Sequence, residues 1–459
     1  MLSVLKKRAD RNKRQLSIDE ACSVAKKQRA AKSVRAKRRT DDGWVDIEPN
    51  SYKWIPKTLD FPTPGARLSN IKRMDSISDI FLKLLPPSVL VAVRKEVGCE
   101  TLKNSSLDDI YKMYAANIYL RAAAPLVDEG TEKNVFNSVY KSACGELGGQ
   151  GCLGINKMVF LRNRFKISPS IARDKLSKSF CRAICLGEFV SLDEKQKKWR
   201  GRSPYIKKVL AKKNDPIGHW NTQVCVNLNS TSEPFIIGLY PFAGELECGQ
   251  PLERRTEIWD WLISLLEYKE QPKMLPVICA DSFYLDNSAR DMLNARSIMY
   301  HCSIKKNWFQ NITAHLEAQV KDMGKWSAAE NTKTGEVAVF TWSGEQDIGK
   351  KFLLSTMMKK QSGKQDAKDP PGWDAYKLMF CGCDKYNTQI GKFVWPYRLP
   401  HWTAHFDDIF QVHVVLNTVA IWRENNSNDD CSTTKELMIT LAKELHERCV
   451  QKRLPASQW

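Results

Sequence analysis

The spacing of apolar residues changes along the chain and separates a helical part from a part rich in strands. Over residues 44–189, apolar side chains recur every three or four positions, as in Ile77-Ile80-Phe81-Leu84, which predicts amphipathic helices. Beyond them, short apolar runs of strand length predominate. These runs span 222–228, 234–240, 275–280, 298–304, 337–342 and 352–357. The pattern predicts a helical lobe followed by strands.

Helices are also expected within and after the strand-rich part. Residues 253–268 place Ile258, Trp261, Leu262 and Leu265 on one helical face. Two more helical segments are expected near 402–423 and 433–452. We therefore expect an α/β fold with five parts. They are a disordered basic tail (1–44), a helical lobe (45–190), a core (191–358), a polar linker (359–372) and a C-terminal helical part (373–459).

The stretch LPVICADSFYLDNSARDML, residues 275–293, contains an abrupt change from strand to helix. A buried strand is expected to end at Asp281, and Asp286 or Asn287 is expected to cap the helix that carries Leu293. An acid at a strand end either accepts hydrogen bonds from the following turn or binds a metal ion. The sequence leaves both interpretations of Asp281 open.

Positive charge is concentrated at the start of the chain. The formal net charge is +19, and residues 1–40 contain 14 basic and 3 acidic residues, so they hold +11 of it. Such a segment cannot bury enough apolar area to fold, which predicts disorder. Its Lys/Arg clusters are typical of a nuclear-import signal and of an arm that binds phosphate, so we expect a nuclear protein. A solubilising tail is the alternative.

Cysteine usage and hydropathy argue against a disulfide-bonded secreted protein and against a membrane-spanning protein. The 14 cysteines are scattered singly and no signal-peptide pattern begins the chain, which predicts reduced thiols in the cytosol or nucleus. The longest apolar stretch, residues 84–93, contains Pro86 and Pro87 and is far shorter than a membrane span. Neither a phosphate-binding Gly-rich loop nor a nucleophile elbow is present, so no small-molecule substrate is expected.

Eight stretches, taken in order, resemble motifs of the piggyBac-type DDE transposases. They are LDEKQKKWRGR (192–202), KKNDPIGHW (212–220), GLYPFAG (238–244), ADSFYLDNSARDML (280–293), SIKKN (303–307), FLLST (352–356), YNTQIGK (386–392) and HWTAHFDDIFQVHVVLNTVAIW (401–422). The resemblance implies a mixed-sheet RNase H-like core, preceded by a helical lobe for DNA binding and dimerisation and followed by C-terminal helices. It also implies three aspartates that hold two Mg²⁺ ions, and a C-terminal cysteine-rich zinc module.

This chain has an aspartate at one of the three positions that the resemblance implies. Asp281 matches the second position, Asn227 or Asn229 takes the first, and Val394 takes the third. Two cations about 4 Å apart repel each other, and neutral side chains at two positions leave that repulsion uncompensated. Past residue 425 only Cys431 and Cys449 remain, so the zinc module has no counterpart. We therefore expect a DNA-binding, catalytically inactive relative, with Mg²⁺ needed only if activity survives and Asp281 as its one candidate ligand.

Basic stretches with interleaved tryptophans are the candidate DNA contacts, because cations pair with phosphates and aromatic rings stack on bases. The candidates are Lys197, Lys198, Arg200, Arg202, Lys207, Lys208, Lys305 and Lys306. In the alternative interpretation, residues 196–213 form a solvated loop whose Trp199 packs on the core. DNA is the expected partner, and a homodimer follows from the resemblance.

Three other possibilities stay open at this stage. An active enzyme could rebuild a metal site from Asp281 with Asp407 or Asp408. Zinc could bind Cys381, Cys383, His401 and His405, although the Cys-x-Cys spacing is unusual in structural zinc sites, so we do not expect it. The chain could also be a fossil reading frame without a selected function.

Overall fold

The computed structural model describes most of the chain after residue 42 and forms two compact units. The described residues are 43–47, 53–56, 66–68, 76–123, 133–198, 203, 205–208, 217–242, 255–268, 275–342, 349–361, 370–393, 402–426 and 432–452. The first unit combines residues 1–55 with 304–371, and the second combines 56–303 with 372–459. The predicted disordered tail lies outside the described residues.

The first unit is an antiparallel sheet covered by one helix. Its strands β1 (Trp44–Asp46), β11 (Trp326–Asn331), β12 (Val337–Trp342) and β13 (Lys350–Ser355) pair in that order, and β2 (Lys53–Pro56) pairs with β14 (Met358–Gln361). The turn between β11 and β12 is closed by Asn331, whose Oδ1 accepts from the amides of Lys333 and Thr334, while Gly335 takes a positive φ of 68°. The helix α11 (Gln310–Ala318) packs on this sheet, and Ser327 Oγ donates to its Leu316 carbonyl at 2.6 Å.

The second unit begins with the predicted helical lobe. Its helices are α2 (Ile77–Leu84), α3 (Pro87–Val97), α4 (Leu107–Ala123), α5 (Lys133–Glu146), α6 (Ile155–Arg164), α7 (Pro169–Ile171), the π-helical turn Ala172–Leu176 and α8 (Ser177–Arg182). The described residues between 44 and 68 form short strands, among them β3 (Arg67–Leu68), at the start of the range for which a mainly helical pattern was expected; β3 pairs with β4 (Ile184–Cys185). The helical lobe predicted from apolar spacing is otherwise confirmed over the described residues.

A mixed sheet of RNase H-like topology forms the core of the second unit. The central strand β5 (Phe189–Lys198) is antiparallel to β7 (Ile217–Asn227) and parallel to β9 (Val277–Ala280). Beyond β7 lie β6 (Ile206–Lys208) and β8 (Pro234–Pro241), both antiparallel to it; beyond β9 lies the parallel β10 (Tyr300–Ile304). Crossover helices α9 (Arg255–Glu267) and α10 (Asn287–Ala295) precede the two parallel strands, as such connections require. The predicted α/β fold with an RNase H-like core is confirmed.

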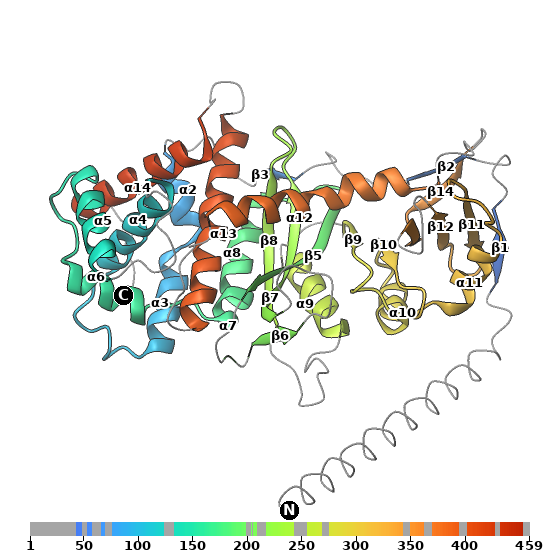
Figure 1. Ribbon diagram of the computed structural model, residues 1–459, viewed down its shortest axis with the longest axis horizontal. Coiled ribbons are helices and arrows are strands. Elements are labelled where there is room, and N and C mark those ends of the chain that lie inside the picture. The colour runs from blue at the N-terminus through green and yellow to red at the C-terminus, as the bar shows by residue number, and fades with distance from the viewer. Residues whose placement is uncertain are drawn as a thin grey trace, which may run out of the picture. The chain divides into compact units, whose positions relative to one another are not determined.

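Three long helices complete the second unit. They are α12 (Trp373–Phe393), α13 (Trp402–Asn425) and α14 (Thr434–Val450). Helix α12 contacts β5, β7 and β8, so it lies along the sheet, as Figure 1 shows in orange over the green strands. Helix α14 packs on α4 and begins with a capping box between Thr433 and Glu436. Among the described residues, no helix is both long and apolar enough to cross a membrane.

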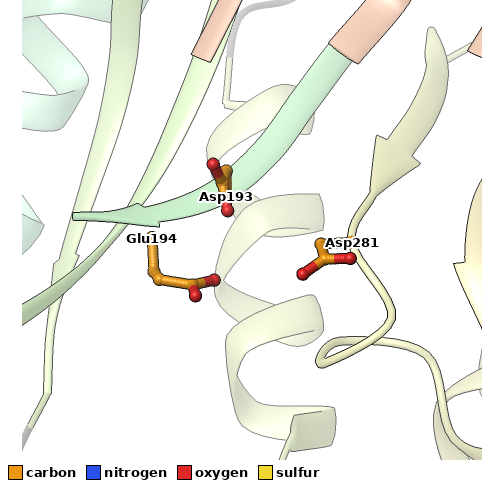
Figure 2. Close-up of side chains that lie close together, drawn as sticks. All are labelled: Asp193, Glu194 and Asp281. Atoms are coloured by element: carbon orange, nitrogen blue, oxygen red, sulfur yellow. The ribbon is translucent and has the colours of Figure 1, made fainter. Parts of the chain in front are cut away.

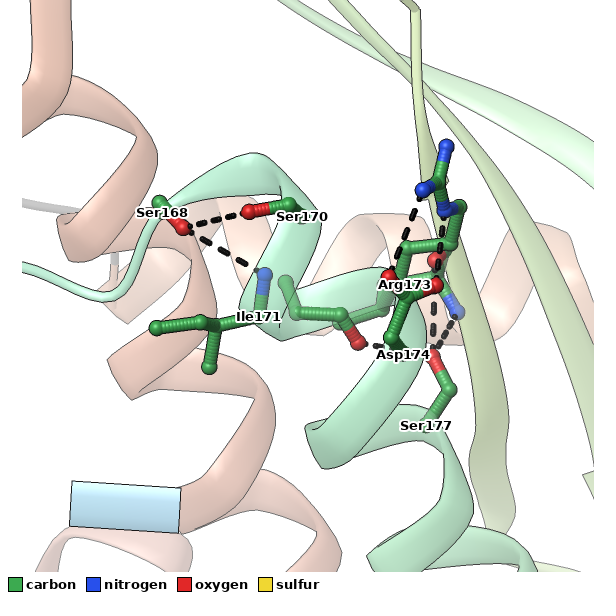
Figure 3. Close-up of polar contacts among 8 residues, drawn as sticks. Ser168, Ser170, Ile171, Arg173, Asp174 and Ser177 are labelled. Atoms are coloured by element: carbon green, nitrogen blue, oxygen red, sulfur yellow. Dashed lines mark hydrogen bonds and ion pairs between the residues drawn. The ribbon is translucent and has the colours of Figure 1, made fainter. Parts of the chain in front are cut away.

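The outer edge of β8 is closed by side chains instead of another strand. Asn417 of α13 accepts from the Ile236 amide at 3.0 Å and donates to the Ile236 carbonyl at 2.8 Å. Ser177 accepts from the Leu239 amide at 2.9 Å and donates to the Ala172 carbonyl at 2.9 Å, within the π-helical turn (Figure 3). Satisfying the edge amides in this way prevents the strand from pairing with another chain.

Replacing Asn417 with alanine should lower the free energy of unfolding by about 2–3 kcal/mol. The substitution leaves a buried amide and a buried carbonyl of Ile236 without partners, and each unsatisfied buried group costs roughly 1–3 kcal/mol. Urea denaturation followed by circular dichroism measures the change. Asn163→Ala, at an exposed position of α6, is the control and should change stability by less than about 0.5 kcal/mol. Equal values for the two variants would contradict this account of the edge.

Candidate metal centre

Two neighbouring parallel strands bring acidic residues together where β9 ends beside the middle of β5. In β5, Val190 and Leu192 are buried, and in β9 all four residues are buried, so both strands are fixed in the core. Their register pairs Leu192 with Ala280. The next residue on each strand is an aspartate, Asp193 and Asp281. Because neighbouring strands lie about 4.8 Å apart, these two side chains start close together.

Glu194 adds a third carboxylate to the same point. Carboxylate oxygens of Asp193, Glu194 and Asp281 all lie within 4.8 Å of one another (Figure 2). We call these three residues the acidic cluster. Glu194 is buried and the two aspartates are partly buried. A cation bound to oxygen ligands sits about 2.0–2.6 Å from each of them, so three oxygens this close can surround one divalent ion.

Asp281 is held in a fixed orientation by hydrogen bonds from two elements. Its Oδ1 accepts from the Ser282 amide at 2.6 Å and from Ser303 Oγ of β10 at 3.0 Å. Ser303 Oγ in turn accepts from the hydroxyl of Tyr376 in α12 at 3.4 Å. Partners of this kind orient metal ligands in proteins. Figure 2 shows one carboxylate oxygen of Asp281 directed toward Asp193 and Glu194.

Crowding of the carboxylates disfavours their ionised forms. Burial, together with the neighbouring Glu194, raises the pKa of Asp193 well above its ordinary value. On α12, burial and the charge of Asp281 raise the pKa of Asp384. Asp384 is therefore a fourth carboxylate within electrostatic reach of the cluster. A divalent cation would relieve this repulsion, because its hard positive charge suits carboxylate oxygens. The residues present fit Mg²⁺ or Mn²⁺.

The two asparagines expected at the first motif position lie elsewhere. The register sets Gln223 of β7, and not Asn227, beside Asp193. Asn227 pairs with Pro234 at the far end of β7, which is four residues or roughly 13 Å further along the strand. Asn229 follows in a loop, where its amide donates to the Ala66 carbonyl at 2.9 Å. The structure therefore brings Asp193 and Glu194 to Asp281, and neither asparagine. Val394 lies outside the described residues.

Asp407 and Asp408, the acids of the rearranged-site alternative, form ion pairs within the helices. Asp408 pairs with Arg121 of α4, and Asp407 lies 3.8 Å from Lys166. Asp407 Oδ1 also accepts from the Ile167 amide at 2.9 Å. Burial raises the pKa of Asp407, and the nearby Lys166 opposes that shift. These contacts direct both carboxylates toward cationic side chains, so they are structural residues of α13.

The four suggested zinc ligands do not form a described cluster. Cys381 donates to the Leu378 carbonyl of its own helix at 3.1 Å, whereas Cys383 donates to Ser191 of β5 at 3.6 Å. His401 and the side chain of His405 lie outside the described residues.

The candidate DNA-binding residues fall on different elements. Lys197 and Lys198 end β5, opposite His219 and Gly218 of β7. Lys207 and Lys208 lie on β6, which pairs with the same end of β7. In the first unit, Lys305 covers the ring of Trp308 at 4.7 Å, and Lys306 pairs with Glu317. Arg200 and Arg202 lie outside the described residues. Of these cations, the structure places Lys197 and Lys198 on β5 and Lys207 and Lys208 on β6, the two strands that flank the same end of β7.

Sequence reasoning missed Asp193 and Glu194 as candidate metal ligands. Its strand pattern began at residue 222, because β5 turns polar after Leu192 and the stretch DEKQKK resembles a loop. The available signal was the short apolar run Phe189-Val190 with Leu192, followed at once by two acids.

Comparisons with known proteins identify the fold. No protein-family model matches the chain, and no curated protein sequence matches it. A solved structure described as the cryo-EM structure of a piggyBac transposase synaptic complex with hairpin DNA is similar, with a TM-score of 0.64 and 13% sequence identity. The similarity covers 86% of this chain and 85% of that chain. The chain therefore has a fold like that of a piggyBac transposase.

Proposed function

We propose that this chain is a piggyBac transposase-related protein that binds DNA and holds one divalent cation at the acidic cluster, without strand-transfer activity. The observation that carries the proposal is the convergence of Asp193 and Glu194 of β5 with Asp281, which follows β9, in a transposase-like fold. Nuclear location and homodimerisation belong to the same proposal, supported by the basic tail and by the family resemblance.

Charge supports DNA as the partner. The excess of 71 basic over 52 acidic residues favours a polyanion, and association with DNA releases counterions from its phosphates. The similar solved structure is a transposase with hairpin DNA. The backbones of Lys197, Lys198, Lys207 and Lys208 lie at one end of β7, on the two strands that flank it, which supports contact with a single stretch of DNA backbone.

The compactness of the cluster supports a single cation. Phosphoryl transfer by the two-metal mechanism needs ions about 3.5–4 Å apart, with carboxylates on both sides of the pair. Here three carboxylates converge on one point, and the motif positions Asn227 and Asn229 lie away from it. A lone divalent cation there would offset most of the negative charge of the cluster and would join the middle of β5 to the end of β9.

Metal-dependent DNA cleavage is the second candidate function, and Asp384 is the observation that favours it. This acid on α12 is within electrostatic reach of Asp281 and could complete a second cation position. The acidic cluster and Asp384 would then bind two cations, which would polarise the phosphate and activate water.

Fluorescence anisotropy with a labelled duplex, repeated at several salt concentrations, tests DNA binding. We expect affinity to fall steeply with salt and to persist in EDTA, because phosphate contacts do not need the cluster. Replacing Lys197, Lys198, Lys207 and Lys208 with glutamine should reduce the salt slope; the matched control replaces Lys83, Lys95, Lys103 and Lys141, which are exposed on the helical lobe. A salt-independent or absent association would overturn the proposal. Plasmid nicking with Mn²⁺ that disappears in Asp281→Asn would establish the second candidate.

A further inference from the structure

Helix α12 carries a row of stacked aromatic rings. The rings of Trp373 and Tyr376 lie 5.6 Å apart at an interplanar angle of 26°, and those of Tyr376 and Phe380 lie 5.3 Å apart at 10°. Spacings of three and four residues place these side chains on one helical face. The next position on that face is Asp384.

This row ends beside the acidic cluster. One residue before Asp384, Cys383 Sγ donates to the Ser191 carbonyl of β5 at 3.6 Å. Three residues after it, the Asn387 side-chain amide donates to the Glu194 carbonyl at 3.4 Å. Residue 384 therefore lies between the levels of Ser191 and Glu194 along the sheet.

Hydrogen bonds also join the middle of the row to the cluster. Tyr376 donates to Ser303 at 3.4 Å, and Ser303 donates to Asp281 at 3.0 Å. At the start of α12, His301 of β10 contacts the Gly372 carbonyl at 2.8 Å. These contacts fix the helix, and with it the rings, relative to the carboxylates.

Partial exposure distinguishes the row from ordinary core packing. Tyr376 is buried, but Trp373 and Phe380 at its two ends are only partly buried. Flat aromatic surfaces in contact with solvent beside a cation site suit nucleobases, which stack on aromatic rings regardless of sequence. Bases of a duplex already stack on one another, so only unpaired nucleotides can use such a surface.

We propose that the partly exposed rings of Trp373 and Phe380, at the two ends of this row, form a stacking track for unpaired nucleobases of DNA, with Tyr376 buried between them as support and with the cation of the acidic cluster meeting the phosphate of the stacked nucleotide. The inference rests on the proposed DNA-binding function and specifies its ligand as DNA with unpaired ends or flaps.

Oligonucleotides that contain 2-aminopurine test the track, because this base loses fluorescence when it stacks. The full-length protein is titrated into a single-stranded oligonucleotide and into a duplex of the same sequence. We expect quenching of the single strand by the wild type. In Phe380→Ala and Trp373→Ala the quenching should be lost and single-strand affinity should fall roughly tenfold, in line with stacking energies for bases on aromatic rings.

The control is Leu378→Ala, because Leu378 is 66% exposed on the same helix and lies outside the row. This variant should quench as the wild type does. Phe380→Trp keeps a stacking ring, so it should restore quenching even if the alanine variants lose helix stability. Duplex affinity should be unchanged in all variants. Wild-type-like quenching in both alanine variants, or no restoration by Phe380→Trp, would overturn the track, whereas failure to bind either DNA would overturn the proposed function itself.

Discussion

Asp281→Asn is expected to lower the affinity for Mn²⁺ by roughly 100-fold, since losing even an outer-shell partner of a metal ligand costs about 10- to 100-fold. An amide oxygen can still ligate, but it brings no charge to offset that of the ion. Asp193→Asn should have a similar effect, because its carboxylate belongs to the same three-residue cluster. Electron paramagnetic resonance of free Mn²⁺ during a titration measures both affinities.

The control for this experiment is Asp291→Asn, an exposed acid of α10, which should bind Mn²⁺ as the wild type does. Unchanged binding in both cluster variants would show that the ion does not bind between β5 and β9. The DNA-binding part of the proposal would then stand alone.

The same site should make metal-free stability depend on pH. The pKa of Asp193 is raised above its ordinary value of 3.8, so its contribution to stability is full below that value and is lost as pH rises through the folded-state pKa. In EDTA, the wild type should therefore lose stability relative to Asp193→Asn as pH rises above about 4. Mn²⁺ should remove that difference at neutral pH, because the cation favours the ionised carboxylate. Thermal unfolding followed by circular dichroism provides the comparison.

Arg121→Ala is expected to destabilise the second unit by roughly 3–5 kcal/mol, the range measured when one partner of a buried ion pair is removed. Arg121 and Asp408 are 6% and 4% exposed, so the remaining carboxylate would be left charged and desolvated. Arg121 also donates to the Phe393 carbonyl at 3.3 Å and to Gln411 at 3.3 Å. It therefore joins α4 to α12 and α13.

Urea denaturation measures this loss, and two further variants define its origin. Replacing both Arg121 and Asp408 with leucine should recover most of the stability, because no unpaired buried charge remains. Lys103→Ala removes a pair in which Lys103 and Glu100 are 66% and 90% exposed, so it should cost less than about 1 kcal/mol. A loss for Arg121→Ala no greater than for Lys103→Ala would contradict a stabilising role for the buried pair.

Local sequence patterns were sufficient to predict many of the individual helices and strands. The helix expected over 253–268 is α9, and the segments expected near 402–423 and 433–452 are α13 and α14. Asp286 caps α10, with its Oδ1 accepting from the Ala289 amide at 2.9 Å. These features depend on periodicity and on hydrogen bonds a few residues apart, which one stretch of sequence contains in full.

Of two elements that line the candidate site, β5 escaped prediction, and α12 was covered only by the broad expectation of a C-terminal helical part over 373–459. The strand β5 carries DEKQKK after Leu192, so its pattern lacks the apolar alternation of a half-buried strand. Helix α12 begins within a stretch that follows the polar linker and includes Gly382, where a Cβ atom would lie 2.6 Å from Asn227 Oδ1. The polar residues of β5 include the acids of the site, and Gly382 allows α12 to pack closely against Asn227. These same residues weaken the local sequence signals of strand and helix.

The sequence by itself determined that a buried strand ends in Asp281, that helices precede and follow the sheet, and that the chain carries excess positive charge. Only the tertiary structure decided which residues meet Asp281. Its neighbour is Asp193, 88 positions earlier, because β5 and β9 pair in parallel with Leu192 beside Ala280. Register across a sheet depends on packing of the whole core, so no local pattern specifies it. The same packing places Asp407 beside Lys166 and Asp408 beside Arg121. It also places the aromatic row of α12 near the acidic cluster.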